Sequence, residues 1–353
     1  MALLQLRGMS KAFFGVPVLK EVDLALEGGE VLGLVGENGA GKTTLMNIVG
    51  GVVAADSGEM WLAGERYAPR TPREASARGV GFIHQELNLF ANLSIGENLF
   101  VERFPRRLGL IDRPRLRREA RQALDSVGLE LPPEMPLERL SPGEKQLVEI
   151  ARALSQEAQI LIFDEPTTSL THRETERLFA LIRRLKEEGR AVVYISHILG
   201  DVLKLCDRVA VLRDGEKVGE GPVGEFDIPK LIRLMVGRNL EQLYPPRPSR
   251  PGAEVLLEVR DLAREGVLEG VNLRLHRGEV LGLFGLMGSG RTELARALFG
   301  LDPVDRGEVA LGGRLLRGGP SQRIAQGLAY LTEDRREEGL LMEAPILDNL
   351  GLA

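Results

Sequence analysis

Cysteine is almost absent from this chain of 353 residues, which contains only Cys206. A single cysteine can form neither an intrachain disulfide nor a cysteine-rich zinc module, so the sequence indicates a reducing compartment. Long apolar runs are also absent, and none approaches the ~18 residues of a membrane-spanning helix. Arg7 interrupts the N-terminal segment before the apolar core of a signal peptide can form. The sequence therefore favours a cytosolic protein.

An excess of positive charge is missing too. The net charge is −5, which gives no support to nucleic-acid binding. Hydrophobic residues make up 43% and charged residues 27%, as in ordinary globular proteins, and the length predicts roughly two domains. Glycine is in excess, with 42 residues. Glycine serves in tight turns and where the backbone approaches phosphate, and the motifs decide between these uses.

The chain contains an internal repeat. Residues 29–64, GEVLGLVGENGAGKTTLMNIVGGVVAADSGEMWLAG, align without a gap with residues 278–313, GEVLGLFGLMGSGRTELARALFGLDPVDRGEVALGG, and 17 of the 36 pairs are identical. Between the copies, residues 244–252 read YPPRPSRPG, and four prolines can continue neither a helix nor a central strand. We therefore expect a first domain at 1–243, a linker at 244–252 and a second domain at 253–353.

The first copy alternates short apolar runs with helical periods, which predicts an α/β fold around a largely parallel sheet. The runs VLGLVG, ILIFDEP, AVVYISH and RVAVLRDG have the continuous hydrophobicity of buried parallel strands. Residues from 86 to about 157 are rich in arginine and helical in period, which predicts a helical insertion. Functional side chains are expected at the carboxyl ends of the strands.

Residues 36–43, GENGAGKT, match the phosphate-binding loop G-x-x-x-x-G-K-[ST] between an apolar strand and a helical segment. Gly36, Gly39 and Gly41 let the backbone curl so that its N–H groups converge on a phosphate at a helix N-terminus. Lys42 is expected to bridge the β- and γ-phosphates, and Thr43 to hold Mg²⁺.

Two adjacent carboxylates end the run ILIFDEP. Ionised carboxylates in apolar surroundings repel each other unless a counter-charge such as Mg²⁺ is present. Asp164 is the expected metal-side residue, and Glu165 can act as a general base on an attacking water.

The segment LSPGEKQ precedes the helical run LVEIARAL, so Ser141 can cap that helix. With this segment the sequence resembles the ATP-binding-cassette (ABC) ATPases, which carry an LSGGQ signature between a glutamine loop and an ILxxDEP strand. The order here is GENGAGKT, HQE, LSPGEKQ, ILIFDEP and YISH. The resemblance implies a cassette with a parallel-sheet core, an antiparallel β arm and a helical subdomain, followed by the N-terminal part of a second cassette.

The resemblance assigns roles by position. Glu165, His197 and Gln85 would be catalytic, and Thr43, Gln85 and Asp164 would hold Mg²⁺. Phe13 would stack on adenine, with Phe14 as a competitor. The nucleotide would lie on Gly36, Asn38, Gly39, Ala40, Gly41, Lys42, Thr43 and Thr44. Ser141 and Gly143 of the signature would contact ATP bound to another cassette, because cassettes of this family pair head to tail.

The duplicated cassettes, together with HQELNLF and MVGRNLEQLYP, look most like ATPases of monosaccharide importers for ribose, galactose, xylose or arabinose. The resemblance implies a separate transmembrane sugar permease, a periplasmic or extracellular sugar-binding protein, and a peripheral position on the cytoplasmic face of the membrane. ATPases of nucleoside importers are the nearest alternative. Two further alternatives are a soluble tandem ABC ATPase acting on ribosomes or nucleic acid, and a P-loop kinase. The acidic chain and the short proline-rich linker argue against the tandem ATPase.

The second copy departs from the pattern. The loop formed by Gly285, Gly288, Gly290, Arg291 and Thr292 has arginine in place of the lysine, and Glu333 stands where the first copy has Gln85. Arginine's planar fork does not replace a compact ammonium, and a carboxylate repels phosphate. In the first copy's signature, Pro142 and Glu144 replace Gly and Gln. Head-to-tail pairing would bring these departures into one degenerate ATP site.

The spacing of the first copy also predicts that the second lacks its signature and paired carboxylates, since their positions would fall beyond Ala353. We therefore expect a C-terminally truncated chain that binds Mg-ATP at the first site and hydrolyses it slowly in isolation. Homodimers through the first cassette would show a second-order dependence of the rate on protein concentration.

Overall fold

The computed structural model describes residues 2–83, 89–101, 103–155, 158–167, 170–237, 252–286, 288–332 and 338–351. Contacts divide the chain into two compact units, Met1–Tyr244 and Pro245–Ala353. Of the expected linker, only Gly252 lies within the described residues. Each unit has its own core.

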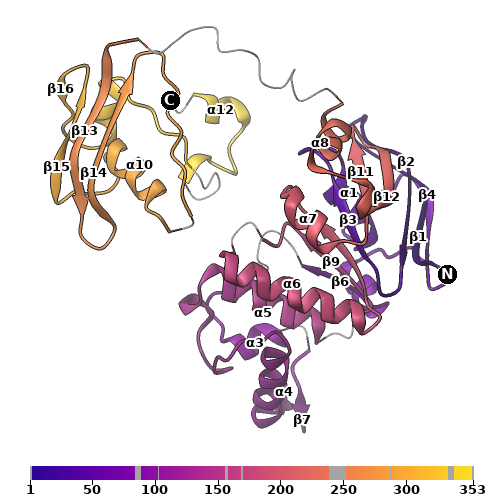
Figure 1. Ribbon diagram of the computed structural model, residues 1–353. Helices are drawn as coiled ribbons and strands as arrows, with labels where there is room; N and C mark the ends of the chain where they lie inside the picture. The colour runs from indigo at the N-terminus through magenta and orange to yellow at the C-terminus, as the bar shows by residue number, and fades with distance from the viewer. Residues whose placement is uncertain are drawn as a thin grey trace. The chain divides into compact units, whose positions relative to one another are not determined.

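A six-stranded sheet forms the centre of the first unit, in the order β12-β11-β3-β10-β9-β6 (Figure 1). The strands are β3 (Val31–Val35), β6 (Val80–Ile83), β9 (Ile160–Asp164), β10 (Ala191–Ile195), β11 (Arg208–Arg213) and β12 (Glu216–Pro222). All pairs are parallel except β11 with β12. Every residue of β3, β9 and β10 is buried, which explains why their sequences are continuously apolar.

An antiparallel arm covers one side of this sheet. It contains β1 (Ala2–Phe13), β2 (Val16–Glu27), β4 (Ser57–Leu62) and β5 (Glu65–Arg66), in the order β2-β1-β4-β5. Helix α1 (Lys42–Val49) shares a core with the arm and with β3, since Leu45 packs in one cluster with Leu6 and Leu34. The short helix α2 (Pro72–Ala77) leads into β6. The start of α1 is thereby fixed between two sheets.

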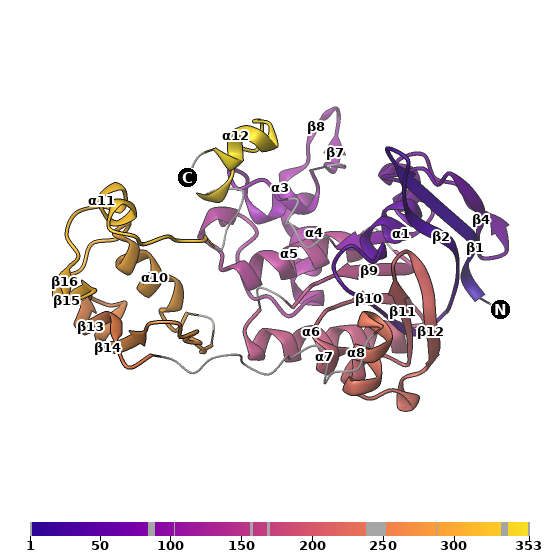
Figure 2. The same cartoon turned by 90° about the horizontal axis from the view of Figure 1, so that it is seen from above.

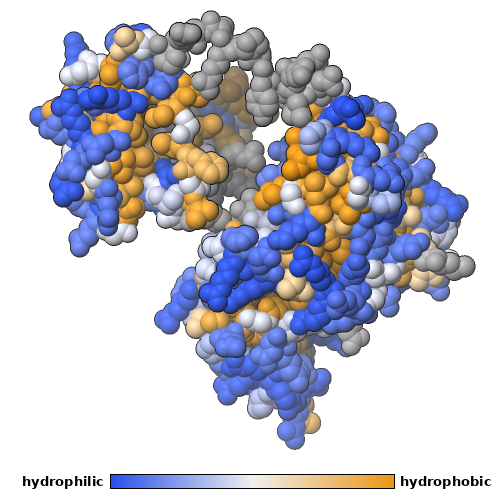
Figure 3. Space-filling model, in the orientation of Figure 1, coloured by the Kyte–Doolittle hydropathy of each residue, from blue (hydrophilic) through white to orange (hydrophobic). Residues whose placement is uncertain are grey.

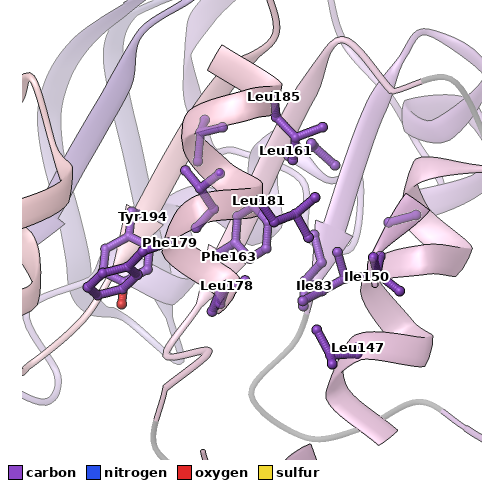
Figure 4. Packing of buried hydrophobic residues seen from close by; sticks show 14 of the residues in the cluster. Ile83, Leu147, Ile150, Leu161, Phe163, Leu178, Phe179, Leu181, Leu185 and Tyr194 are labelled. Carbon is purple, nitrogen blue, oxygen red and sulfur yellow. The ribbon is translucent and has the colours of Figure 1, made fainter. Parts of the chain in front are cut away.

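Helices cover the other face of the central sheet: α5 (Pro142–Leu154), α6 (His172–Glu187), α7 (Leu199–Leu205) and α8 (Ile228–Val236), with the 3-10 turn η2 (Val223–Glu225). Figure 4 shows Phe163 of β9 facing Leu181 of α6, with Ile150 of α5 in the same cluster. The rings of Phe179 and Tyr194 meet edge to face at 6.3 Å. The helices therefore hold the carboxyl ends of β9 and β10 in place.

The expected helical insertion, residues 86 to about 157, contains α3 (Ile95–Leu99), α4 (Arg113–Ser126), the 3-10 turn η1 (Leu137–Arg139) and the whole of α5. The structure adds a small hairpin of β7 (Arg106–Arg107) and β8 (Leu110–Ile111), which the helical period of the sequence does not reveal. Asn98 is fully buried in this part, and its side chain accepts from the Phe90 N–H at 2.7 Å. This amide ties the start of the insertion to α3.

The second unit contains an antiparallel sheet in the order β14-β13-β15-β16, and the described part of this unit also contains α10, α11 and α12. Their bounds are β13 (Val255–Arg264), β14 (Leu268–His276), β15 (Arg306–Leu311), β16 (Arg314–Leu315), α10 (Arg291–Phe299), α11 (Pro320–Ala325) and α12 (Ile346–Leu350). The antiparallel arm of the first unit, and the helix that follows its glycine-rich loop, therefore both recur in the second unit. Residues 280–284, the counterpart of β3, form no strand, and Phe284 is fully exposed.

The reason is the hydrogen bonding of β3, whose neighbours β10 and β11 come more than 150 residues later in the chain. The 353 residues contain no counterpart of these strands for the second copy. The predicted α/β cassette with a parallel core, an antiparallel arm and a helical subdomain is confirmed, and the second unit contains the arm and loop helix of a second one.

Candidate nucleotide site

The loop from Gly36 to Thr43 connects β3 to α1 and fits closely against its surroundings. Gly41 caps α1 with a φ of 99°, in the left-handed region that favours glycine. A Cβ atom on Gly41 would lie 2.7 Å from Leu19 Cδ2, and one on Gly36 would lie 2.4 Å from Leu212 O. Glycine is therefore required at both positions, as the sequence predicts for a loop that wraps a phosphate.

Lys42 begins α1, and its side chain turns back into this loop. It is only 6% exposed, and its Nζ donates to the carbonyls of Gly36 at 2.9 Å and Glu37 at 3.0 Å. Burial lowers the pKa of the Lys42 ammonium, while the nearby carboxylates of Glu165 and Asp164 act in the opposite direction. The cation is thus fixed in position at the centre of the loop, where phosphate oxygens would be strong partners.

Asp164 lies at the carboxyl end of β9, next to the start of α1. Its Oδ2 accepts a hydrogen bond from Thr43 Oγ1 at 3.2 Å. Burial raises the pKa of Asp164, the Glu165 carboxylate adds to this rise, and Thr43 and Lys42 oppose it. A hydroxyl and a carboxylate are oxygen ligands that suit Mg²⁺. Within the described ranges no three His, Cys, Asp or Glu side chains form a metal cluster, so a cation held here would need phosphate oxygens as well.

Glu165 and His197 come from neighbouring strands and meet beyond their ends. Glu165 Oε2 lies 3.1 Å from His197 Nδ1. The backbone N–H of Glu165 donates to Ile195 O at 3.0 Å, and its φ of 51° is unusual for a residue with a side chain. Such strain is typical of functional sites, since the surrounding structure must hold it. The structure therefore brings the predicted base and the predicted catalytic histidine together beside Asp164.

The signature segment LSPGEKQ forms the N-terminus of α5, and two of its own residues cap this helix. Ser141 Oγ accepts from the Glu144 N–H at 3.2 Å, while Glu144 Oε2 accepts from the Ser141 N–H at 2.8 Å. The glutamate that departs from the family pattern therefore belongs to a capping box. A Cβ atom on Gly143 would lie 2.1 Å from Glu174 Oε1, so a larger residue there would have to displace the Glu174 carboxylate.

The sequence did not single out Glu174, which joins two functional segments. Its Oε2 accepts from the Thr171 N–H at 2.8 Å and from Thr171 Oγ1 at 2.7 Å, which caps α6. The pattern T-x-x-E at residues 171–174 is the signal that could have revealed this cap. The carboxylate thus connects the start of α6 to the signature at Gly143.

Several predicted residues are not brought to this place or cannot be located. Gln85 and Glu333 lie outside the described residues. Phe13 ends β1, is 39% exposed and lies 5.4 Å below the Lys11 ammonium, whereas Phe14 is fully exposed in the following turn. Adenine stacking by either ring remains a prediction. Asn38 and Gly39 lie exposed on the loop, and Ala40 is buried beneath it.

The second loop repeats the turn of the first but not its lysine. Gly288 and Gly290 have φ values of 74° and 87°, like Gly39 and Gly41. Arg291 is exposed at the start of α10, and its side chain forms no hydrogen bond to any residue that the structure describes, in contrast to the buried Lys42. The backbone pattern is thus encoded locally, whereas the buried cation depends on a complete core.

Replacement of Asp164 by asparagine is expected to raise the melting temperature of the first unit by a few degrees at pH 7 without nucleotide. The pKa of Asp164 lies above its ordinary value of 3.8, so the folded state binds the proton of this carboxyl more tightly than the unfolded state does. Stability is therefore lost as the pH rises from 3.8 through the pKa of Asp164 in the folded state. The gain of the variant should therefore vanish at pH values below the ordinary pKa. Calorimetry across this pH range measures it.

Asp56→Asn is the matched control, with the opposite sign. The hydrogen bond from Lys11 lowers the pKa of the exposed Asp56, so its charged form stabilises the fold above pH 3.8. That variant should lose stability at pH 7. A lower melting temperature for Asp164→Asn at neutral pH would contradict the burial argument.

Comparisons with known proteins agree with this geometry. The ABC transporter family matches residues 19–168 and 268–347. The "Ribose import ATP-binding protein RbsA 2" of Rubrobacter xylanophilus is 49% identical over 352 residues, which are 99% of this chain and 68% of that protein. The "Putative ribose/galactose/methyl galactoside import ATP-binding protein 1" of Agrobacterium fabrum is 45% identical over 99% of this chain and 70% of its own.

Solved structures give the same result. A dimeric ATP-binding cassette in a post-hydrolysis state with ADP and phosphate is 27% identical, with a TM-score of 0.55 over 62% of this chain and 98% of that one. A nucleotide-free cassette from an ABC transporter shares the fold, with a TM-score of 0.59 over 67% of this chain and all of its own. No helix among the described residues is both long and apolar enough to cross a bilayer. The chain therefore belongs to the ABC transporter family, as an ATP-binding cassette protein.

Proposed function

We propose that this chain is the ATP-hydrolysing subunit of an importer for monosaccharides of the ribose and galactose type. One observation carries the proposal: Lys42, Thr43, Asp164, Glu165 and His197 converge where α1 begins and β9 and β10 end. The printed names of the relatives, which are ribose and galactose import ATP-binding proteins, support the sugar class.

The site residues divide the work of phosphoryl transfer. Backbone N–H groups of the loop and the Lys42 ammonium would bind the phosphates, and Thr43 and Asp164 would hold Mg²⁺, which would neutralise charge on the phosphate oxygens. Glu165 accepts a proton from the attacking water. His197, hydrogen-bonded to Glu165 at 3.1 Å, orients that carboxylate. Water is activated only where both side chains meet the γ-phosphate.

The proposed partners are a second cassette, paired head to tail as in the family, and the membrane components of an importer. Each ATP is completed by Ser141 and Gly143 of another cassette, so the chain by itself hydrolyses slowly and its rate rises with the square of its concentration if first cassettes form homodimers. A separate transmembrane permease and a sugar-binding protein would place the chain on the cytoplasmic face of the membrane.

The test is reconstitution with a purified permease of ribose or galactose type. ATPase activity should rise several-fold when the matching sugar-binding protein is loaded with sugar, and Glu165→Gln should abolish the rise. Loaded nucleoside-binding protein with its own permease is the comparison. Stimulation only by the nucleoside system would contradict the sugar assignment, and co-sedimentation with ribosomes without permease binding would contradict the importer role.

A further inference from the structure

A short hairpin in the helical part presents apolar side chains to solvent. β7 and β8 pair antiparallel, with Arg106 opposite Ile111 and Arg107 opposite Leu110, and residues 108–109 make the turn. Leu108 is 97% exposed, Leu110 77% and Ile111 47%. Figure 2 shows the hairpin projecting beside α3. The apolar side chains at its tip contribute nothing to the core of this unit.

The backbone of the turn makes the leucine more unusual. Leu108 has a φ of 52° and Gly109 a φ of 84°, so both central residues are left-handed. Turns of this kind favour Asn-Gly, since the left-handed region is unfavourable for a bulky side chain. A leucine that is both strained and exposed is not explained by the folding of this chain. Its side chain is therefore available to a partner that gains from contact with it.

Positive charge surrounds the hairpin. Residues 103–121 contain eight arginines and only two acids, Asp112 and Glu119, a net charge of +6 in a chain whose total is −5. All eight arginines are exposed. Figure 3 shows mostly hydrophilic side chains at the end of the first unit where this hairpin lies. The net charge of the segment is thus opposite to that of the chain as a whole.

Part of this charge remains unpaired. Arg115 pairs with Glu119 at 2.6 Å and Arg117 pairs with Glu134, whereas Arg106 and Arg107 form no ion pair with any residue that the structure describes. Beside the hairpin lies a hollow of about 1050 Å³. Its walls include Arg73, Arg103, Arg106, Arg115, Phe100 and Phe104, together with Glu119. The guanidinium groups along this hollow can bind phosphate oxygens.

We propose that this hairpin contacts an anionic phospholipid bilayer, with Leu108 and Leu110 entering the interface and the arginines binding lipid phosphates. A bilayer offers an apolar phase and anionic headgroups within a few ångströms of each other. This arrangement matches the apolar tip of the hairpin and the arginines around it. A polynucleotide offers phosphates but no apolar phase for Leu108. A stable protein interface buries about 800 Å² per partner, more than three apolar side chains on a projecting turn can supply.

The experiment measures partition of the full chain into vesicles of phosphatidylcholine alone and of phosphatidylcholine with about 30 mol% phosphatidylglycerol. Binding is expected only to the anionic vesicles and should weaken as salt rises. Leu108→Asn is the sharpest variant, because asparagine suits the turn while it removes the apolar tip. It should weaken partition about tenfold without lowering the melting temperature.

Charge is tested with Arg106→Gln/Arg107→Gln, which should weaken partition about 30-fold. Arg66→Gln/Arg70→Gln removes the same charge from exposed positions elsewhere and should leave partition unchanged. Equal partition into neutral and anionic vesicles would overturn the proposal, as would no binding to either. Wild-type partition of Leu108→Asn would also overturn it, since charge alone would then account for binding.

Discussion

Replacement of Lys42 by alanine is expected to weaken Mg-ATP binding by at least about 100-fold, or about 2.7 kcal/mol, and to abolish hydrolysis. The buried ammonium holds the loop through Gly36 O and Glu37 O and lies near the carboxylates of Asp164 and Glu165. No other cation among the described residues takes part in these loop contacts. Titration calorimetry with Mg-ATP measures the affinity, and phosphate release measures the rate.

Arg291→Ala is the matched control, since Arg291 has the same place in the repeat. It is exposed in a loop without a central strand behind it, so its removal should change neither the affinity nor the rate by more than about twofold. A Lys42→Ala protein that keeps most of its ATPase activity would contradict the assignment of the first loop. A large loss in Arg291→Ala would show that the second loop carries the nucleotide.

Replacement of Glu165 by glutamine is expected to lower the rate of hydrolysis by about 1,000-fold while Mg-ATP binding is kept. The amide preserves the shape of the side chain and can still bond to His197, but it accepts no proton from water. Single-turnover kinetics separates the chemical step from binding.

Glu188→Gln is the matched control, because it changes an exposed carboxylate at the end of α6 and should leave the rate of hydrolysis unchanged. Gln146→Glu would not serve as a control, because Gln146 is buried in α5. Equal losses of affinity and rate in Glu165→Gln would indicate a role in binding instead of proton transfer. Undiminished hydrolysis would exclude Glu165 as the base.

The sequence predicts the first unit well because its signals are local. Continuous apolar runs identify β3, β9, β10 and β11, and the functional side chains follow directly at the strand ends. The positions of Asp164 and Glu165 beside the loop therefore follow from the sequence alone. The distance of 3.1 Å between Glu165 and His197 is a finding of the structure that the sequence does not predict, and the catalytic role of both residues stays a prediction.

The rest depends on contacts between distant segments. VLGL occurs at residues 31–34 and at 280–283, but only the first copy forms a strand, since β3 needs β10 and β11 as neighbours. Likewise the packing of Glu174 against Gly143 joins residues 31 positions apart, which no periodicity reveals. The hairpin at β7 and β8 has strands of two residues, too short for an alternation signal.

The central claim is that this chain has one working nucleotide site, in its first unit. Equilibrium binding of Mg-ATP to the Glu165→Gln variant tests it most directly, because slow hydrolysis leaves the bound nucleotide intact. We expect one Mg-ATP per chain, lost when Lys42→Ala is added and kept when Arg291→Ala is added. Two Mg-ATP per chain, or one that persists without Lys42, would contradict the claim.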